Sequence, residues 1–209
     1  MLLNSISPKN ILSYGDDQPT IELTQLNILV GPNGSGKSNL IECVSLLQSA
    51  PKALSTADSG WLWKGSSKET PTARIETVIA NPAGPKNLRH WMEFTATDDR
   101  FGPSDERIEN EQPDPGHPKP YFYFAFQNGW PVTNVKNGRR QLRRDDINTD
   151  QSILSQRKDP DAYPEITWLG DLYGKIRIYR HGPFGHQAPA RNPQQPDLPE
   201  TSSARTLKT

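Results

Sequence analysis

The spacing of hydrophobic and polar positions changes several times along the 209 residues. Residues 21–30 begin by alternating and end in a short apolar run, which predicts a strand over Ile21–Val30. Apolar residues then recur at intervals of three and four, which predicts an amphipathic helix over residues 37–48. Its apolar stripe consists of Leu40, Cys43, Val44 and Leu47. Pro51 marks the point where this helix must stop.

Farther along the chain the period becomes two. Residues 72–80 and 88–97 alternate around a turn-forming segment and predict a β-hairpin. Residues 99–119 are rich in proline and charge and predict a loop. Residues 119–135 predict a second hairpin, because Asn128-Gly129 suits its two-residue turn, and Asn137-Gly138 is a further turn signal.

The last third of the chain contains one short helix and ends in a polar segment. After Pro164 the pattern predicts a helix that ends at Gly174, followed by a strand over residues 175–179. Residues 187–209 are rich in Pro, Gln and Ser and carry too few apolar residues to offset the entropy of ordering. We therefore expect one folded lobe over residues 1–186 and a disordered tail over residues 187–209.

A phosphate-binding motif lies where the first strand meets the first helix. Gly31, Gly36, Lys37 and Ser38 satisfy the pattern G-x-x-x-x-G-K-[ST]. Glycines let consecutive N–H groups turn toward phosphate oxygens, and the N-terminus of the following helix adds a positive dipole. Lys37 then reaches the β- and γ-phosphates, and the Ser38 hydroxyl is a ligand for Mg²⁺. A glycine-rich turn that matches by chance is the alternative, but the predicted strand and helix on either side favour a site for ATP and Mg²⁺.

The remaining residues of the motif narrow the class of protein. The predicted nucleotide contacts are Gly31, Pro32, Asn33, Gly34, Ser35, Gly36, Lys37, Ser38 and Asn39. With Asn33, Ser35 and Asn39 the segment resembles the P-loop of ABC-type ATPases of the SMC and RecF group. Residues 150–185 resemble the middle region of RecF-like bacterial ATPases that carry the AAA label. The resemblance implies an α/β P-loop NTPase fold, the first lobe of an ABC-type ATPase, with a strand–helix core beside an antiparallel hairpin sheet.

The same resemblance implies further site residues. It places Lys9 and Asn10 near the adenine or the phosphates, although both suit an ordinary solvated turn as well. It also implies a glutamine that contacts Mg²⁺ and positions the attacking water. Gln151 is the first candidate for that glutamine and Gln156 the second, and either suits an exposed polar position equally. Lys37 and Gln151 are thus the expected catalytic residues, with Ser38 and Gln151 at the metal.

Two motifs that ATP hydrolysis requires in the ABC class are not found after Lys37. No run of four apolar residues ends in Asp-Glu, and no serine-glycine signature occurs. We interpret the chain as a truncated ATPase lobe or as a lobe that pairs with a separately encoded second lobe or dimer partner. The family activity would be ATP hydrolysis coupled to DNA repair or phage defence. The alternatives are a nucleotide-binding regulatory module without hydrolysis and a nonfunctional remnant.

Composition and charge add few constraints. Lys plus Arg and Asp plus Glu both number 24, so net charge gives no case for nucleic acid, although four arginines within residues 139–144 leave a DNA contact open beside an ordinary exposed hairpin. No apolar run approaches the roughly 20 residues of a membrane helix, and the N-terminus lacks a signal-peptide pattern. We expect a cytoplasmic protein, in which the lone Cys43 packs in the core.

Overall fold

The computed structural model describes residues 3–179, except residues 53, 55, 56, 67–70, 83, 98, 99, 128, 129, 136, 137 and 143–146. Within these residues, nine strands, three α-helices and one 3₁₀ helix are formed. In chain order they are β1 (Leu3–Lys9), β2 (Ile21–Glu22), α1 (Lys37–Ser49), β3 (Ala57–Asp58), η1 (Ser59–Trp61), β4 (Thr72–Ile79), β5 (Leu88–Thr97), β6 (Arg100–Asn110), β7 (Phe122–Gln127), β8 (Trp130–Val135), β9 (Gly138–Gln141), α2 (Ile153–Gln156) and α3 (Pro164–Gly174). None of these helices is long and apolar enough to cross a membrane.

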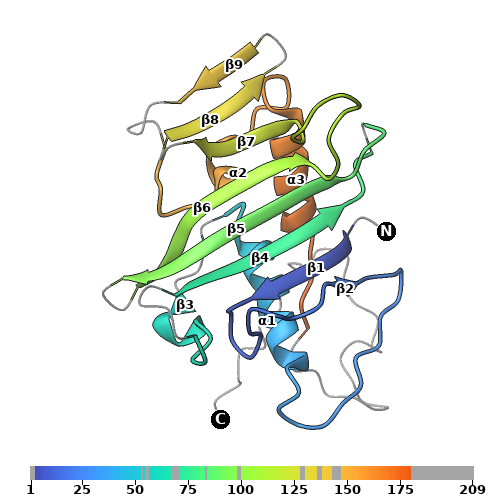
Figure 1. Ribbon diagram of the computed structural model, residues 1–209, viewed down its shortest axis with the longest axis vertical. Helices are drawn as coiled ribbons and strands as arrows, with labels where there is room; N and C mark the ends of the chain where they lie inside the picture. Colours follow the sequence, from blue (N-terminus) through green and yellow to red (C-terminus); the bar gives the residue numbers. More distant parts are fainter. Residues whose placement is uncertain are drawn as a thin grey trace, which may run out of the picture.

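A single antiparallel sheet organises the described residues. Its strand order is β2-β1-β4-β5-β6-β7-β8-β9, and β3 pairs with the first two residues of β6. From β4 onward each strand pairs with the next strand in sequence, so the sheet grows by hairpins. The three α-helices lie on one face of the sheet, and the loop that precedes α1 extends beyond the β1 side (Figure 1).

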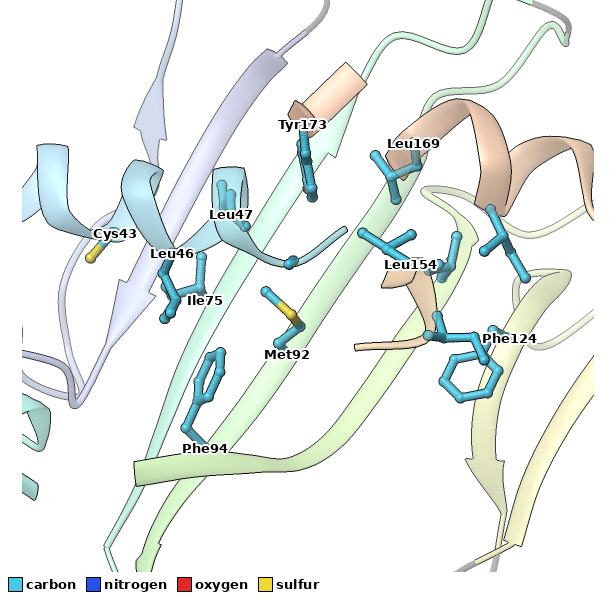
Figure 2. Close-up of a cluster of buried hydrophobic side chains, with 14 of the residues drawn as sticks. Cys43, Leu46, Leu47, Ile75, Met92, Phe94, Phe124, Leu154, Leu169 and Tyr173 are labelled. Carbon is cyan, nitrogen blue, oxygen red and sulfur yellow. The ribbon is translucent and has the colours of Figure 1, made fainter. Parts of the chain in front are cut away.

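The core lies between α1, α3 and the covered face of the sheet (Figure 2). The buried residues of α1 are Leu40, Cys43, Leu46 and Leu47, with Val44 half-buried. This confirms the predicted stripe almost residue for residue. The alternating residues of β4 and β5 are buried as the period of two requires, from Ala73 to Ile79 and from Leu88 to Phe94. The first predicted hairpin is therefore confirmed.

The predicted strand over Ile21–Val30 is wrong for most of its length. Only Ile21–Glu22 pair with β1, and the last ladder-like contact is the Leu23 amide donating to Asn4 O at 2.8 Å. Asn27 then closes a local turn, because its side chain accepts from the Thr24 amide at 2.9 Å and donates to Thr24 O at 2.9 Å. Apolar sequence alone does not make a strand without a neighbouring strand to pair with.

The predicted loop over residues 99–119 is also wrong, since its first half forms β6 near the middle of the sheet. The charges that suggested a loop are paired: Glu109 forms ion pairs with Arg89 on the neighbouring β5 and with Arg107 on β6 itself. Pro103 lies beside an irregularity in the pairing of β5 with β6, where a missing N–H is tolerated. Residues 111–121 do connect β6 to β7 outside any strand.

The later predictions are confirmed in part. β7 pairs with β8 through Gln127 and Trp130, as the predicted two-residue connection at Asn128-Gly129 requires. β8 pairs with β9 through Val135 and Gly138, so the second connection begins one residue earlier than predicted and Gly138 is the first residue of β9. The turn residues 128, 129, 136 and 137 lie outside the described part. The helix after residue 163 is confirmed as α3, whereas residues 175–179 form no strand. The predicted tail over residues 187–209 also lies outside the described residues.

The other face of the sheet carries a ladder of charged side chains instead of helices. Arg74 pairs with Glu76 at 2.8 Å and lies over the Trp91 ring at 4.2 Å. Asp105 stands directly opposite Glu93 on the neighbouring strand. Burial, together with the nearby Glu93 carboxylate, raises the pKa of Asp105 to about 6, against its ordinary 3.8. The folded protein therefore holds a proton on Asp105 at pH values where the unfolded chain does not.

We predict that Asp105→Asn stabilises the protein at neutral pH. Between pH 3.8 and about 6 the folded state binds more protons at Asp105 than the unfolded state, so this group's contribution to stability falls as pH rises. The variant should melt at a higher temperature than wild type above pH 6, and the difference should vanish near pH 4.

Asp114→Asn is the matched control with the opposite sign. A hydrogen bond and ion pair with Lys86 lower the pKa of Asp114. Its replacement should therefore cost stability at neutral pH, and that cost should disappear in acid. Thermal melts of the three proteins from pH 3.5 to pH 8 make the measurement, and a parallel response of both variants would contradict the assignment.

Candidate functional site

The loop between residues 31 and 36 has the backbone conformation that its glycines permit. Gly34 and Gly36 have φ angles of 81° and 87°, in the left-handed region that other residues seldom occupy. A Cβ on Gly31 would lie 2.9 Å from Ser35 Oγ, so the Ser35 hydroxyl would have to shift to admit a side chain there. The positive φ angles make glycine the favoured residue at positions 34 and 36 of the loop.

Lys37 occupies the centre of this loop. Its Nζ donates to Gly31 O at 2.7 Å, to Pro32 O at 2.6 Å and to Ser35 Oγ at 3.0 Å. The loop thus wraps around the ammonium group of the residue that begins α1. A phosphate oxygen that takes the place of these neutral oxygens would gain a charge-assisted hydrogen bond.

The N-terminus of α1 lacks a side-chain cap. Gly36 is the N-cap residue, it makes no side-chain hydrogen bond, and the first turn contains no acidic residue. The first N–H groups of a helix need an acceptor, and an anion in front of them is stabilised by the helix dipole. Ser38 is exposed in this first turn and Asn39 is half-buried. A loop of glycines, a lysine and an uncapped 13-residue helix are together suited to a phosphate group.

The turn that follows β1 lies against the end of this loop. The hydroxyl of Tyr14 donates to Gly36 O at 3.0 Å, and Ser13 Oγ would lie only 2.9 Å from a Cβ on Gly36. Sequence reasoning did not single out Tyr14 or Ser13. Two non-glycine residues of the turn, Asn10 and Leu12, have positive φ angles of 51° and 54°. Such a conformation costs roughly 1 kcal/mol or more per residue and is uncommon for a residue as bulky as leucine.

A cavity of about 360 Å³ opens beside this turn. Asn10, residues 15–18 and Trp63 line it. Asn10 is buried, and its side-chain amide donates to Asp16 Oδ1 at 3.2 Å. The structure therefore places Asn10 in the wall of this cavity. The turn beside the cavity, which carries Tyr14, contacts the loop of residues 31–36, called the phosphate loop below.

Gln151 and Gln156 lie elsewhere. Gln151 precedes α2, and α2 packs near the C-terminal end of α1, since a Cβ on Gly170 would meet both Leu154 O at 3.4 Å and Pro51 at 3.6 Å. The phosphate loop is at the N-terminal end of α1, roughly 20 Å away along 13 helical residues (Figure 1). The structure brings Lys37, Ser38 and the turn at Asn10 together, and it does not bring Gln151 to them.

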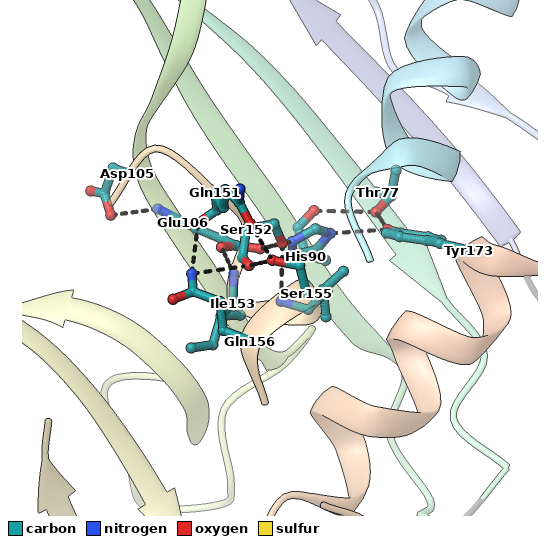
Figure 3. A network of polar contacts seen from close by, with 11 residues as sticks. Thr77, His90, Asp105, Glu106, Gln151, Ser152, Ile153, Ser155, Gln156 and Tyr173 are labelled. Carbon is teal, nitrogen blue, oxygen red and sulfur yellow. Dashed lines mark hydrogen bonds and ion pairs between the residues drawn. The ribbon is translucent and has the colours of Figure 1, made fainter. Parts of the chain in front are cut away.

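A buried polar network holds the Gln151 segment on the sheet (Figure 3). Glu106 of β6 accepts from Ser152 Oγ at 2.6 Å and from the Ile153 amide at 2.7 Å. His90 contacts the same carboxylate at 3.0 Å and Tyr173 Oη at 3.0 Å. Tyr173 Oη also lies 2.8 Å from Thr77 Oγ1. Every one of these side chains is buried, so the network joins three strands to α2 and α3 and leaves no access for a substrate.

Burial also determines the pKa values of the neutral groups near these sites. It raises the pKa of the Tyr173 hydroxyl well above its usual value, so this group remains a hydrogen-bond donor. It raises the pKa of the Cys43 thiol to about 12, which confirms core packing and not a reactive thiolate. Among the described residues, no cluster of His, Cys, Asp and Glu could hold a metal ion. Arg143 and Arg144, two of the four arginines that leave a DNA contact open, lie outside the described part.

We predict that Glu106→Gln loosens the Gln151 segment. One amide oxygen cannot serve the three donors that the carboxylate accepts, so at least one buried donor loses its partner at a cost of about 1–3 kcal/mol. Amide hydrogen exchange at Ile153 should become faster, and the melting temperature should fall.

Glu109→Gln is the matched control. Glu109 is equally buried on the same strand, but its partners are Arg89 and Arg107 on the outer face. Exchange at Ile153 should stay as in wild type in this variant. Equal acceleration in both variants would show that general destabilisation, and not the loss of the Glu106 hydrogen bonds, determines amide exchange at Ile153.

Comparisons with known proteins give a single match. No curated protein and no solved structure matches the chain. A family model matches residues 26–201, which include the phosphate loop, α1 and the whole sheet from β3 onward. The model carries the description "AAA domain, putative AbiEii toxin, Type IV TA system". Since the match covers most of the chain, the chain belongs to this AAA domain family and is an ATPase-like domain of the P-loop NTPase class.

Proposed function

We propose that residues 31–39 bind the triphosphate of ATP together with Mg²⁺. The observation that carries the proposal is the uncapped N-terminus of α1 behind a glycine loop that wraps around Lys37. Membership of the AAA domain family supports nucleotide as the ligand. Lys37 would exchange its three loop oxygens for phosphate oxygens, and the exposed Ser38 hydroxyl would be the protein's ligand to Mg²⁺.

We place the nucleoside in the cavity beside Asn10. The cavity borders the turn whose Tyr14 contacts Gly36, so a nucleotide with its phosphates in the loop has the cavity within its reach. Asn10 would then contact the base or the ribose, as the resemblance to RecF-like proteins implies. Gln151 remains a proposal for the glutamine at Mg²⁺. Because it lies near the opposite end of α1 from the phosphate loop of its own chain, it could contact only a nucleotide that another segment or another chain brings to it.

We propose further that ATP hydrolysis requires a second lobe or a dimer partner. In support, Leu26, Ile28 and Val30, which lead into the phosphate loop, are 77%, 78% and 89% exposed. Ile41, on the outer side of α1, is exposed as well. Contiguous exposed apolar residues of this kind are typical of a surface that another element covers. The motif residues Asn33 and Asn39 favour the RecF and SMC kind of ATPase, with a role in DNA repair or phage defence and DNA as a possible ligand.

A second candidate function is nucleotide binding without hydrolysis. It is favoured by the position of Gln151, the candidate for the glutamine at Mg²⁺, which lies near the opposite end of α1 from the phosphate loop. Phosphoryl transfer needs positioned carboxylates around the metal and the attacking water. A domain of this kind would use ATP to regulate a partner. Phosphate release separates it from the first function.

We predict that Lys37→Ala abolishes most of the affinity for Mg-ATP. Loss of charge-assisted hydrogen bonds to phosphate should raise the Kd about 10- to 100-fold. Isothermal titration calorimetry of the full chain measures the affinity, and a phosphate-release assay measures turnover. We expect binding without turnover for the isolated wild-type chain.

Lys52→Ala is the matched control, because Lys52 is an exposed lysine just beyond the other end of α1. It should bind Mg-ATP like wild type. Equal binding by Lys37→Ala and wild type would refute the proposed site. Turnover that is lost in Lys37→Ala would show that the isolated chain is already a complete ATPase.

A further inference from the structure

We propose that Tyr14 is a positioning residue for the phosphate loop, an inference that rests on the nucleotide binding proposed above. Its hydroxyl group fixes the peptide unit between Gly36 and Lys37. Through that peptide it sets the direction of the first N–H group that a phosphate would meet at α1.

The geometry of one carbonyl group carries the inference. Gly36 O accepts two hydrogen bonds, one from Tyr14 Oη at 3.0 Å and one from the Leu40 amide at 3.0 Å. A trans peptide is planar, and its C=O and N–H groups point in opposite directions. With Gly36 O held toward the helix and Tyr14, the Lys37 N–H must point out of the helix N-terminus. That is the direction from which an anion is bound.

The turn that presents Tyr14 is braced from both sides. Ile11 and Tyr14 exchange two backbone hydrogen bonds, at 3.0 Å and 2.9 Å. The Leu12 amide donates to Trp61 O at 2.6 Å, and the Trp63 amide donates to Asn10 O at 3.0 Å. These contacts hold Asn10 and Leu12 in the left-handed conformation, which isolated residues of their kind avoid. A strained turn that is held so firmly delivers the tyrosine hydroxyl to a defined place.

The state of the tyrosine and the space around it fit this role. Burial raises the pKa of Tyr14, so its hydroxyl stays protonated and donates at neutral pH. A side chain on Gly36 would approach Ser13 Oγ to 2.9 Å and Tyr14 Oη to 3.5 Å. Glycine at position 36 is favoured by its positive φ of 87°, and Ser13 Oγ would have to move to admit a side chain there.

The test is the variant Tyr14→Phe, which keeps the ring and removes the hydroxyl. Calorimetry would measure the Kd of the full chain for Mg-ATP and for inorganic tripolyphosphate. Loss of the one hydrogen bond that orients the phosphate loop should raise both Kd values by about fivefold. Because tripolyphosphate has no base, an equal loss for both ligands assigns the effect to the phosphate loop. Hydrogen exchange of the Leu40 amide should also become faster, since it shares the acceptor that Tyr14 fixes.

Tyr123→Phe is the matched control. Tyr123 Oη donates to Asn110 Oδ1 at 2.9 Å on the sheet, so the variant loses a similar hydrogen bond far from the loop. It should bind both ligands like wild type and leave Leu40 exchange unchanged.

Two results would overturn the inference: wild-type affinity in Tyr14→Phe, or a loss for Mg-ATP alone, which would place Tyr14 at the base. A wild-type chain that binds neither ligand refutes the proposed function and this role together. Even then, faster exchange of the Leu40 amide in Tyr14→Phe than in wild type would show that Tyr14 Oη bonds to Gly36 O.

Discussion

The packing of α1 on one face of the antiparallel sheet determines where every part of the candidate site lies. Leu40, Cys43 and Leu47 are buried against the sheet residues of β1 and β4, and each large apolar side chain contributes about 2 kcal/mol. A helix with a single apolar stripe has only one rotation about its axis that buries it. That rotation turns Ser38 and Ile41 outward. The glycine loop, which precedes the helix in the chain, extends beyond the β1 side of the sheet (Figure 1).

The two ends of α1 are held by different means. At the C-terminal end, Gln48 donates to Ile176 O at 2.5 Å and Pro51 lies close to Gly170, so α3 fixes the helix there. α3 is itself tied to the sheet through Tyr173, His90 and Glu106. At the N-terminal end, Leu40 is buried in the core and Tyr14 Oη donates to Gly36 O. A buried polar network therefore supports the C-terminal end of the helix, and the turn after β1 contacts the end that would bind nucleotide.

A feature of this fold could be predicted from the sequence when the residues that stabilise it are close together in the chain. The α1 stripe and the β4–β5 hairpin follow from local periodicity, because their partners are neighbours in the sequence. The P-loop motif is recognisable for the same reason, since the cradle is made by consecutive residues. β6 was missed because its charged side chains are paired in the fold, as Glu109 is with Arg89 of β5 and with Arg107 two residues earlier, and the sequence does not show such pairing. Tyr14 carries no local signal at all: its partner, Gly36, is 22 residues away.

The failed prediction of two strands is informative about the site. Residues 26–30 and 175–179 have strand-forming sequences, yet neither pairs with a strand among the described residues. A strand is stable only as one member of a pair, because its N–H and C=O groups need partners. The exit side of the phosphate loop is fixed by the bonds of Gly36 O to Tyr14 and Leu40. Its entry side is held, among the described contacts, by bonds within the loop itself, from Lys37 Nζ to Gly31 O and Pro32 O and from the Ser35 amide to Pro32 O.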